Sequence, residues 1–266
     1  MTRDCAALEG HVALVIGGTR GIGWAICEAL CGRSAQVVTC GTRQDGVASA
    51  RTIAAERRWR LDAVQADACS EKDLDALVTR ASRRSGSITS LVFCAGRAWR
   101  GDAGETSVAD FDDCLALNLR APFVAAKLAL PHLLKAQGAS IVFVSSIWAV
   151  TATRRRLAYS VAKAGLTALT RNLAIDYGDR GLRVNAVAPG YIDTALLRRS
   201  IGEVAQGRDL MPEINARHPL RRIGTPADVG EAVSFLVSPA SQFVTGQTLL
   251  VDGGVTAKFA LADLWE

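Results

Sequence analysis

The sequence predicts an α/β fold: one doubly wound domain with a seven-stranded parallel sheet and helices on both faces. Two observations support this prediction. Seven short runs rich in β-branched residues alternate with longer segments whose apolar residues recur at helical spacing. Several of the short runs are apolar almost throughout, as strands are when helices cover both faces of a parallel sheet. Alternation of this kind is typical of strand–helix–strand units.

The predicted strands are short, and the predicted helices lie between them. We expect strands at 12–16, 36–39, 61–65, 90–93, 140–144, 183–187 and 248–251. We expect helices at 21–31, 46–57, 71–84, 108–136, 158–177 and 227–236. Residues 194–219 are the least regular stretch, which favours a mobile lid or substrate loop. The alternative for this stretch is an ordinary pair of surface helices joined by a loop.

Composition narrows the class of protein. The chain has 266 residues, is 49% hydrophobic and contains no apolar run near the roughly 18 residues of a membrane span. Its first apolar stretch, 12–16, is too short for a secretory signal, so we expect a cytoplasmic protein with no membrane partner. The net charge of +5 comes mostly from dispersed arginines. Nucleic-acid binding usually shows a basic stripe or a known module, and neither is present.

Cysteine and histidine usage predicts neither disulfides nor a metal site. The cysteines at 5, 27, 31, 40, 69, 94 and 114 form no Cys-x-x-Cys pair and have mostly apolar neighbours. They are expected to be buried free thiols in a reducing compartment. The three histidines are scattered without the spacing of metal ligands.

A glycine-rich turn follows the first predicted strand and opens the first predicted helix. It reads Gly17-Gly18-Thr19-Arg20-Gly21-Ile22-Gly23. Glycine permits the tight turn and lets a pyrophosphate approach the amino end of the helix. The spacing differs from the commoner Gly-x-Gly-x-x-Gly fingerprint but serves the same mechanism. Its place after the first strand of an alternating chain predicts a dinucleotide site.

The residues after the second predicted strand favour NADP(H). An acidic residue at this point would bind the adenosine ribose of NAD, but the chain has no acid before Asp45. Arg20 and Arg43 can offer forked, charge-assisted hydrogen bonds to a 2′-phosphate, and Thr42 can add a hydroxyl. The alternative is that either arginine simply points to water.

The segment from Tyr159 to Lys163 carries the candidate acid/base. On a helix, residues four apart are neighbours on one face. A phenol with a pKa near 10 is a poor base at pH 7, but a cation one turn away stabilises the phenolate. Ser146 lies thirteen residues before Tyr159. Tyr-x-x-x-Lys alone also occurs by chance on solvated helices, so the pair depends on the rest of the chain.

Taken in order, the motifs resemble the compact short-chain dehydrogenase/reductase family from about residue 11 to residue 254. Beyond the glycine turn and Tyr159-x-x-x-Lys163, the resemblance rests on Asp67-Ala68, Cys94-Ala95-Gly96, Asn118, Ser146, Pro189-Gly190-Tyr191-Ile192-Asp193-Thr194, Pro219-Leu220-Arg221-Arg222, Val244-Thr245-Gly246-Gln247 and Val251-Asp252-Gly253-Gly254. It implies a single Rossmann-type domain over residues 1–266. The cofactor part would span about 10–145 and the catalytic and substrate part about 146–266.

The resemblance also implies residue roles. Tyr159 is expected to exchange the proton, and Lys163 to lower its pKa and hold the nicotinamide ribose. Ser146 is expected to bind the substrate oxygen, and Asn118 to hold a relay water. The implied cofactor-binding residues are Gly17, Thr19, Arg20, Gly21, Ile22, Gly23, Thr42, Arg43, Asp67, Ala68, Ala95, Gly96, Asn118, Tyr159, Lys163, Pro189, Gly190, Ile192 and Thr194.

Two residues depart from the family pattern. Ile16 stands where the family usually has threonine, and Cys94 where it usually has asparagine. These changes are expected to remove hydrogen bonds that tie the glycine turn to the fourth strand, at about 1 kcal/mol each.

The expected reaction is NADPH-dependent reduction of a ketone or aldehyde to an alcohol, or the reverse. Hydride would pass to or from nicotinamide, and the proton would come from Tyr159. One alternative is a non-catalytic NADP(H)-binding regulator, although such proteins often lack the tyrosine or lysine. Another is an epimerase or dehydratase acting through transient oxidation, which usually has a longer chain.

Substrate and assembly are less constrained by the sequence. Trp148, Trp99 and Arg154 are candidate substrate contacts, which would suit a small carbonyl or alcohol with an apolar body and an anionic part. The alternative is that Arg154, Arg155 and Arg156 face solvent at a subunit edge. By resemblance, the helices expected at 108–136 and 158–177 pair across subunits in a homodimer or homotetramer. The apolar tail of Phe259, Leu261, Leu264 and Trp265 is expected to be buried, on a neighbouring subunit.

Overall fold

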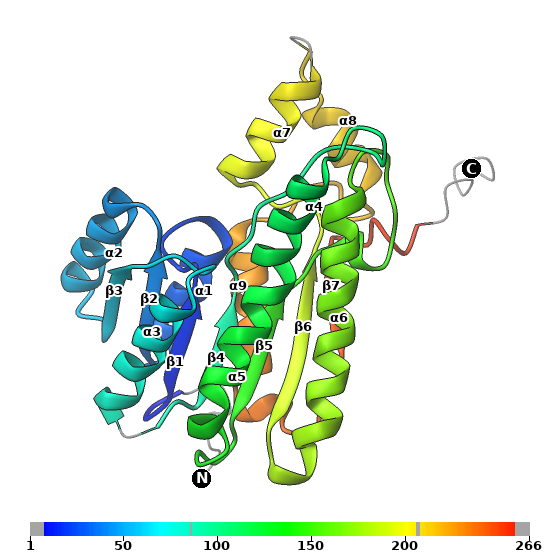
Figure 1. Cartoon of the computed structure of the whole chain (residues 1–266). Coiled ribbons are helices and arrows are strands. Elements are labelled where there is room, and N and C mark those ends of the chain that lie inside the picture. Colours follow the sequence, from blue (N-terminus) through cyan, green and yellow to red (C-terminus); the bar gives the residue numbers. More distant parts are fainter. Residues whose placement is uncertain (1–7, 86, 206–207, 259–266) are drawn as a thin grey trace.

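A seven-stranded parallel sheet forms the centre of the molecule (Figure 1). The computed structural model describes residues 8–85, 87–205 and 208–258. The strand order is β3-β2-β1-β4-β5-β6-β7, which confirms the doubly wound α/β fold. All seven predicted strands are present, and two of them run two residues further than expected. The strands are β1 (Val12–Ile16), β2 (Gln36–Gly41), β3 (Leu61–Gln65), β4 (Ser90–Phe93), β5 (Ser140–Val144), β6 (Arg183–Pro189) and β7 (Thr248–Val251).

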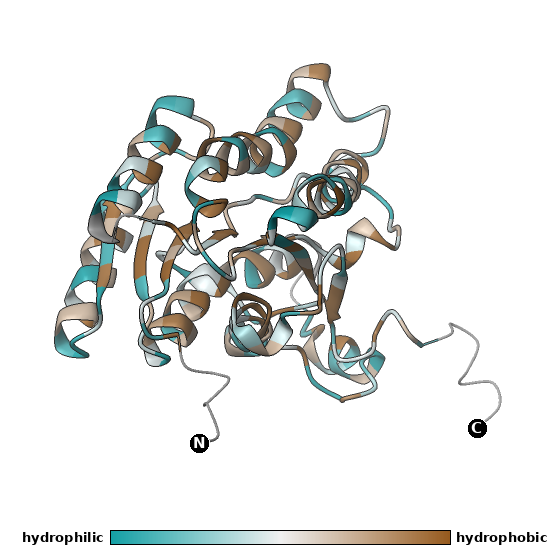
Figure 2. Ribbon diagram, turned by 90° about the horizontal axis from the view of Figure 1, so that it is seen from below, coloured by the Kyte–Doolittle hydropathy of each residue, from teal (hydrophilic) through white to brown (hydrophobic). Residues whose placement is uncertain are grey.

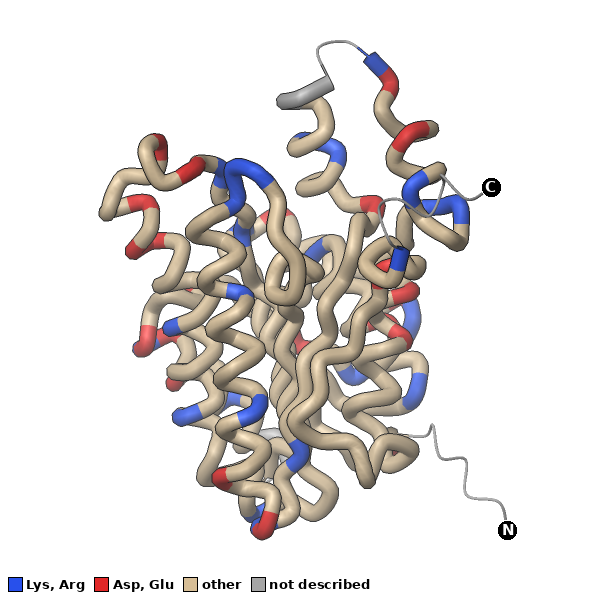
Figure 3. The backbone as a smooth tube through the Cα atoms, turned by 90° about the vertical axis from the view of Figure 1, so that its right-hand side faces the viewer, with Lys and Arg blue, Asp and Glu red and all other residues tan. Residues whose placement is uncertain are grey.

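Helices cover both faces of the sheet. One face packs against α1 (Gly21–Gly32), α2 (Gln44–Glu56) and α9 (Pro226–Val237). The other packs against α3 (Glu71–Ser85), α5 (Ala121–Leu133) and α6 (Leu157–Tyr177). Figure 3 shows that nearly all Lys, Arg, Asp and Glu lie on the helices and loops outside the sheet.

Strand β1 shows why the sheet is buried on both sides. All five of its residues are buried. Leu14 and Ile16 face the core beneath α3 and α5, whereas Ala13 and Val15 face the core beneath α1 and α9. Successive side chains of a strand point to opposite faces, so a strand covered twice must be apolar throughout. Figure 2 shows these hydrophobic strands between helices whose outer sides are hydrophilic.

The helix expected over 108–136 is interrupted. Helix α4 (Val108–Leu115) passes into a π-helical turn, η1 (Ala116–Arg120), and continues as α5. Ser107 caps α4 by accepting a hydrogen bond from the Asp110 N–H at 3.0 Å. The continuous stretch Val108–Leu133 is long and apolar enough to pass a length-and-composition test for a membrane span. It packs against α3, α6 and the sheet, as a core helix does.

Residues 194–219 are more regular than expected. The described part forms α7 (Ala195–Ala205) and α8 (Met211–Arg217), as the alternative of two helices expected. A role of these helices as a lid stays a prediction. Thr194 Oγ1 accepts a hydrogen bond from the Leu197 N–H at 3.2 Å and so caps the amino end of α7. Figure 1 shows both helices above the carboxyl ends of the strands.

The thiols are less uniformly buried than expected. Cys27, Cys31, Cys40 and Cys114 are buried and free, but Cys69 is exposed and Cys94 is half-buried. Both lie in loops at the carboxyl ends of β3 and β4, which line a cleft rather than the core. Cys5 and the apolar tail of Phe259, Leu261, Leu264 and Trp265 lie outside the described residues.

Candidate active site

A cavity of about 1960 Å³ lies at the carboxyl ends of the strands, where open α/β sheets bind ligands. It extends from the glycine turn after β1 to α8. Its lining contains every predicted cofactor and catalytic residue except Asn118, and also the candidate substrate residues Trp99, Trp148 and Arg154. The structure therefore brings residues from the whole length of the sequence to one cleft.

The glycine turn lies against the loop after β4. Gly17 has φ +88°, and a Cβ at this position would lie 2.7 Å from the backbone of Ala95. Only glycine accepts both the left-handed conformation and the close approach. The Cys94 and Ala95 N–H groups both donate to the Ile16 carbonyl at 2.9 Å. The two loops are thus tied by backbone hydrogen bonds, and the expected cost of the departures at Ile16 and Cys94 stays a prediction.

The sequence suggested that Arg43 binds a phosphate, but in the structure its guanidinium is already paired. Its Nε and Nη2 donate to the Asp45 carboxylate at 3.0 and 2.5 Å. This hydrogen bonding lowers the pKa of Asp45 to about 2. Both side chains are exposed and both residues line the cavity, together with Arg20 and Thr42. An anion at Arg43 would have to compete with Asp45.

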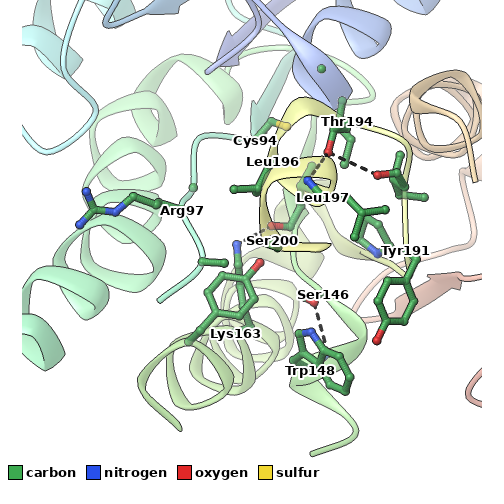
Figure 4. Close-up of a pocket in the computed structure, with 18 of the residues that line it drawn as sticks. Cys94, Arg97, Ser146, Trp148, Lys163, Tyr191, Thr194, Leu196, Leu197 and Ser200 are labelled. Atoms are coloured by element: carbon green, nitrogen blue, oxygen red, sulfur yellow. Dashed lines mark hydrogen bonds between the residues drawn. The ribbon is translucent and has the colours of Figure 1, made fainter. Parts of the chain in front are cut away.

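Helix α6 positions Tyr159 and Lys163 one turn apart at the opposite end of the cavity. The Lys163 ammonium donates to the Val144 carbonyl at 2.9 Å and lies 5.6 Å from the centre of the Tyr159 ring. Ser146 follows β5, and its Oγ accepts a hydrogen bond from the Trp148 N–H at 3.3 Å. Figure 4 shows Ser146, Trp148 and Lys163 close together in the pocket.

Burial dominates the protonation of both α6 residues. It raises the pKa of Tyr159 to about 12, against the effects of a hydrogen bond with Ser146 and the positive charge of Arg156. Burial also lowers the pKa of Lys163 to about 8, against the opposite effect of Cys94 and Cys114. A desolvated group favours its neutral form. In the protein without cofactor, the pKa of Tyr159 is therefore raised by burial and not lowered by Lys163, as was expected.

Asn118 is in the π-helical turn and is fully buried. Its Nδ2 donates to the carbonyls of Arg97 and Cys114, each at 3.1 Å. Its Oδ1 is buried and has no partner among the described residues. A π-turn inside an α-helix often marks a functional site. Although Asn118 does not line the cavity, its amide is held in one orientation with an unsatisfied acceptor.

Aromatic residues form the wall next to Ser146. Trp148 packs edge-on against Tyr191 with ring centres 6.4 Å apart, and Tyr191 packs against His218 at 5.8 Å. Tyr191 and His218 were not among the predicted substrate contacts. The side chain of Arg97 stacks on Trp99 at 3.9 Å, and Figure 4 shows it pointing away from Lys163.

Helix α7, within the stretch expected to be a lid or substrate loop, supplies a further part of the wall. Leu196, Leu197, Ser200 and Ile201 line the cavity, and Figure 4 shows the first three facing the pocket that holds Lys163. The signal was present in the sequence, because residues 197 and 201 are four apart, the spacing of one helix face.

A family comparison agrees with this arrangement. The sequence model of a family described as enoyl-(acyl carrier protein) reductase matches residues 16–256, most of the chain. The chain belongs to the short-chain dehydrogenase/reductase family. Among curated members, it is 38% identical over 255 residues to cis-4-hydroxycyclohexanecarboxylate dehydrogenase of Sinomonas cyclohexanicum, covering 94% of this chain and 98% of that protein. It is 35% identical over 254 residues to 2-(S)-hydroxypropyl-CoM dehydrogenase 3 of Xanthobacter autotrophicus, with the same coverage.

Solved structures of family members have the same fold. The aldohexose dehydrogenase of Thermoplasma acidophilum superposes with a TM-score of 0.87 at 30% identity, covering 96% of this chain and 97% of that one. A variant of actinorhodin polyketide ketoreductase with NADPH superposes with a TM-score of 0.88 at 28% identity, covering 93% and 98%. Since these relatives are dehydrogenases and a ketoreductase, the chain is assigned as an oxidoreductase of this family.

Proposed function

We propose that the protein reduces a ketone or aldehyde to an alcohol with NADPH, or catalyses the reverse, with Tyr159 as the proton donor. One observation carries this proposal: Ser146, Tyr159 and Lys163 line the end of a cavity whose other end is the glycine turn. A nicotinamide cofactor would supply or accept the hydride when bound. The close approach of Gly17 to Ala95 and the unsatisfied Asn118 Oδ1 fit such a cofactor and a proton path beside it.

The roles of the side chains follow from their environments. In reduction, Tyr159 starts as a neutral phenol, since burial holds its pKa near 12, and can give its proton to the developing alkoxide. Ser146 donates a hydrogen bond to the same oxygen and so helps to position the carbonyl. Lys163, whose pKa lies near 8, is close enough to neutrality to exchange a proton with its surroundings. The Oδ1 atom of Asn118 supplies a fixed hydrogen-bond acceptor near the Lys163 ammonium.

The intact set of catalytic side chains favours an enzyme over a non-catalytic NADP(H)-binding regulator. A regulator would not need a buried lysine one turn from a half-buried phenol, because burying an ammonium is costly. Net consumption of NADPH with a carbonyl substrate would further distinguish a reductase from an epimerase or dehydratase, which returns its cofactor to the starting state.

The choice of NADP(H) rests on Arg20, which follows β1, and on Thr42 and Arg43, which follow β2; all three line the cavity. The ion pair of Arg43 with Asp45 favours NAD(H) as the second candidate, because Asp45 competes with a 2′-phosphate. The NADPH named with the ketoreductase structure supports the first choice. Comparing the dissociation constants of NADPH and NADH decides between them.

The decisive experiment follows nicotinamide absorbance with purified protein, NADPH and a panel of ketones, aldehydes and sugars. We expect turnover with at least one class. Tyr159→Phe should lower kcat by roughly 10²–10⁴-fold while NADPH still binds. Wild-type rates in this variant would remove Tyr159 from the mechanism, and loss of NADPH binding would make the variant uninformative about proton transfer, so binding is measured first.

We also propose a homodimer or homotetramer in the cytoplasm. Exposed apolar side chains on α5 and α6 support the assembly: Phe123 is 47% exposed, Val161 46% and Ile175 82%. The free thiols of the described cysteines support a reducing compartment. Light scattering of the purified protein tests the oligomer.

A further inference from the structure

Three consecutive arginines before α6 have three different environments. Arg155 forms an ion pair with Glu105 and does not line the cavity. Arg156 lines the cavity, and its Nη1 donates to the Trp99 carbonyl at 3.2 Å. Arg154 also lines the cavity, and no hydrogen bond or ion pair joins its side chain to any residue that the structure describes. The run is therefore not a uniform solvated surface.

The backbone explains this division. Arg155 has φ +61°, in the left-handed region that non-glycine residues rarely occupy. This turn directs Arg155 to Glu105, while the residues on either side of it line the cavity. The Gly101 N–H donates to the Arg155 carbonyl at 3.1 Å, and the Leu157 N–H donates to the Gly101 carbonyl at 3.4 Å. The loops after β4 and β5 thus hold each other, and Arg154 projects from a supported backbone.

The charge on this side of the cavity has one dominant sign. Among the described lining residues from the segment between β4 and β5, the loop after β5, α7 and α8, the acids are Asp113 and Glu213. The cations in the same segments are Arg97, Arg100, Arg154, Arg156, Arg199 and Arg217. A cavity lined by one sign of charge concentrates ligands of the opposite sign. The lining from the same segments also includes the apolar side chains of Trp148 and Leu196.

Building on the proposed function, we propose that the substrate is an oxo acid or the corresponding hydroxy acid. Its carbonyl or alcohol lies at Ser146 and Tyr159, its apolar body packs along Trp148, and its carboxylate binds the guanidinium of Arg154. Guanidinium and carboxylate form forked, charge-assisted hydrogen bonds. In the reduction, the carbonyl carbon gains the hydride, the oxygen gains the proton, and NADPH is oxidised to NADP⁺. The carboxylate takes no part in bond making.

The experiment compares acids with amides of nearly the same shape. The probes are 4-acetylbenzoate against 4-acetylbenzamide, and 4-oxocyclohexanecarboxylate against its carboxamide. We expect kcat/KM to be about tenfold higher for the acids, the size of one partly exposed charge-assisted contact. Raising the salt concentration should lower kcat/KM for the acids and have little effect on the amides, because salt screens exposed charges.

Variants of two neighbouring residues test the assignment. Arg154→Gln should reduce the acid-to-amide ratio about tenfold, mainly through KM of the acids, and Arg154→Lys should retain most of the ratio. Arg155→Gln is the matched control, since it removes the same charge one residue away from a side chain outside the cavity. It should leave the ratio near the wild-type value.

The failures of the two proposals are distinguishable. Equal rates for acids and amides, or an equal loss of ratio in Arg155→Gln, would overturn the oxo-acid assignment. So would turnover of other carbonyls with none of the four probes reduced, and this result would leave the proposed reductase function standing. Absence of turnover with every carbonyl would overturn the reductase function and, with it, the oxo-acid assignment.

Discussion

Asn118 and Lys163 converge on one point beside Gly96. A Cβ built on Gly96 would lie 3.0 Å from Asn118 Oδ1 and 3.6 Å from Lys163 Nζ. One atom is an acceptor with no partner among the described residues, and the other is a donor already bonded to Val144. The two atoms come from the π-helical turn and from α6, so the packing of these two helical segments sets their approach. An acceptor and a donor placed in this way suit a relay that returns protons to Tyr159.

Replacing the Asn118 amide should slow turnover without abolishing cofactor binding. Asn118→Leu keeps the number and branching of the side-chain heavy atoms but removes the acceptor and leaves the Arg97 and Cys114 carbonyls without their donor. We expect kcat to fall about 10- to 100-fold, equivalent to roughly 1–3 kcal/mol for the loss of such a buried polar group. Steady-state kinetics and NADPH titration measure the two effects. Unchanged kcat in a folded variant would contradict the relay.

The ion pair between Arg43 and Asp45 makes a prediction about cofactor choice. Asp45→Asn removes the competing carboxylate, so NADPH should bind more tightly, by up to about tenfold. Arg43→Ala should weaken NADPH binding and change NADH binding much less. Fluorescence titration of each variant with both cofactors provides the measurement. If Asp45→Asn strengthens NADH as much as NADPH, the 2′-phosphate does not lie at Arg43.

Lys163 should make stability depend on pH. Its folded pKa of about 8 lies below the ordinary lysine pKa of 10.5, so between these values the unfolded chain binds more protons and stability rises with pH. Burying the charged lysine costs roughly 3 kcal/mol below pH 8, and this cost disappears above pH 10.5. Lys163→Met avoids the cost. Its stability advantage over the wild type should therefore be largest at pH 7 and shrink by roughly 3 kcal/mol towards pH 10.5.

Urea unfolding of both proteins at several pH values measures this difference. Cys27, Cys31 and Cys40 titrate alike in the two proteins, so their contribution cancels in the comparison. Cys94 and Cys114, whose pKa values the charge of Lys163 lowers, are replaced by alanine in both proteins. A difference that stays constant between pH 7 and pH 10.5 would show that Lys163 is not buried in its charged form.

Arg183 of β6 should matter for stability although it lies outside the cavity. It is buried, and its guanidinium donates to the Leu236 carbonyl at 2.8 Å and to the Ser241 hydroxyl at 2.9 Å. Leu236 lies in the last turn of α9, where a cation also complements the helix dipole. Arg183→Met leaves buried carbonyls without donors and should lower the free energy of unfolding by about 3 kcal/mol. Arg180→Met, at an exposed site, should change it by less than about 0.5 kcal/mol. Equal stability of the two variants would contradict this role.

Periodicity was enough to predict the sheet and most of the helices. The central strands β1, β4 and β5 are buried on both faces, so their apolar runs are unambiguous. The ends of β1, β3, β4, β5 and β7 match the expectation. The π-turn at Ala116–Arg120 escaped detection because one extra residue in a turn shifts the apolar spacing by less than the pattern resolves. Helices α7 and α8 escaped because both are short and glycine and proline occur within and beside them.

The motifs located the candidate site but not its electrostatics. Fixed spacing placed Tyr159 next to Lys163, since one helix connects them. The partner of Arg43 depended on a rotamer that no motif encodes, and the pKa of Tyr159 depended on how deeply the phenol is buried. The first is a local contact between two exposed side chains, whereas the second is set by packing between segments that are distant in the sequence.

The π-turn also limits how the length of this chain can change. A π-turn holds one residue more than the corresponding α-turn, so it rotates the following helix by about 100° relative to the preceding one. Because of this offset, α4 packs against α6 at the cleft while α5 packs against the sheet. Losing one residue between Cys114 and Ala121 would restore an ordinary helix, but it would turn either Asn118 away from Lys163 or the α5 core face away from the sheet. In this segment, sequence length is therefore a more stringent requirement than sequence identity.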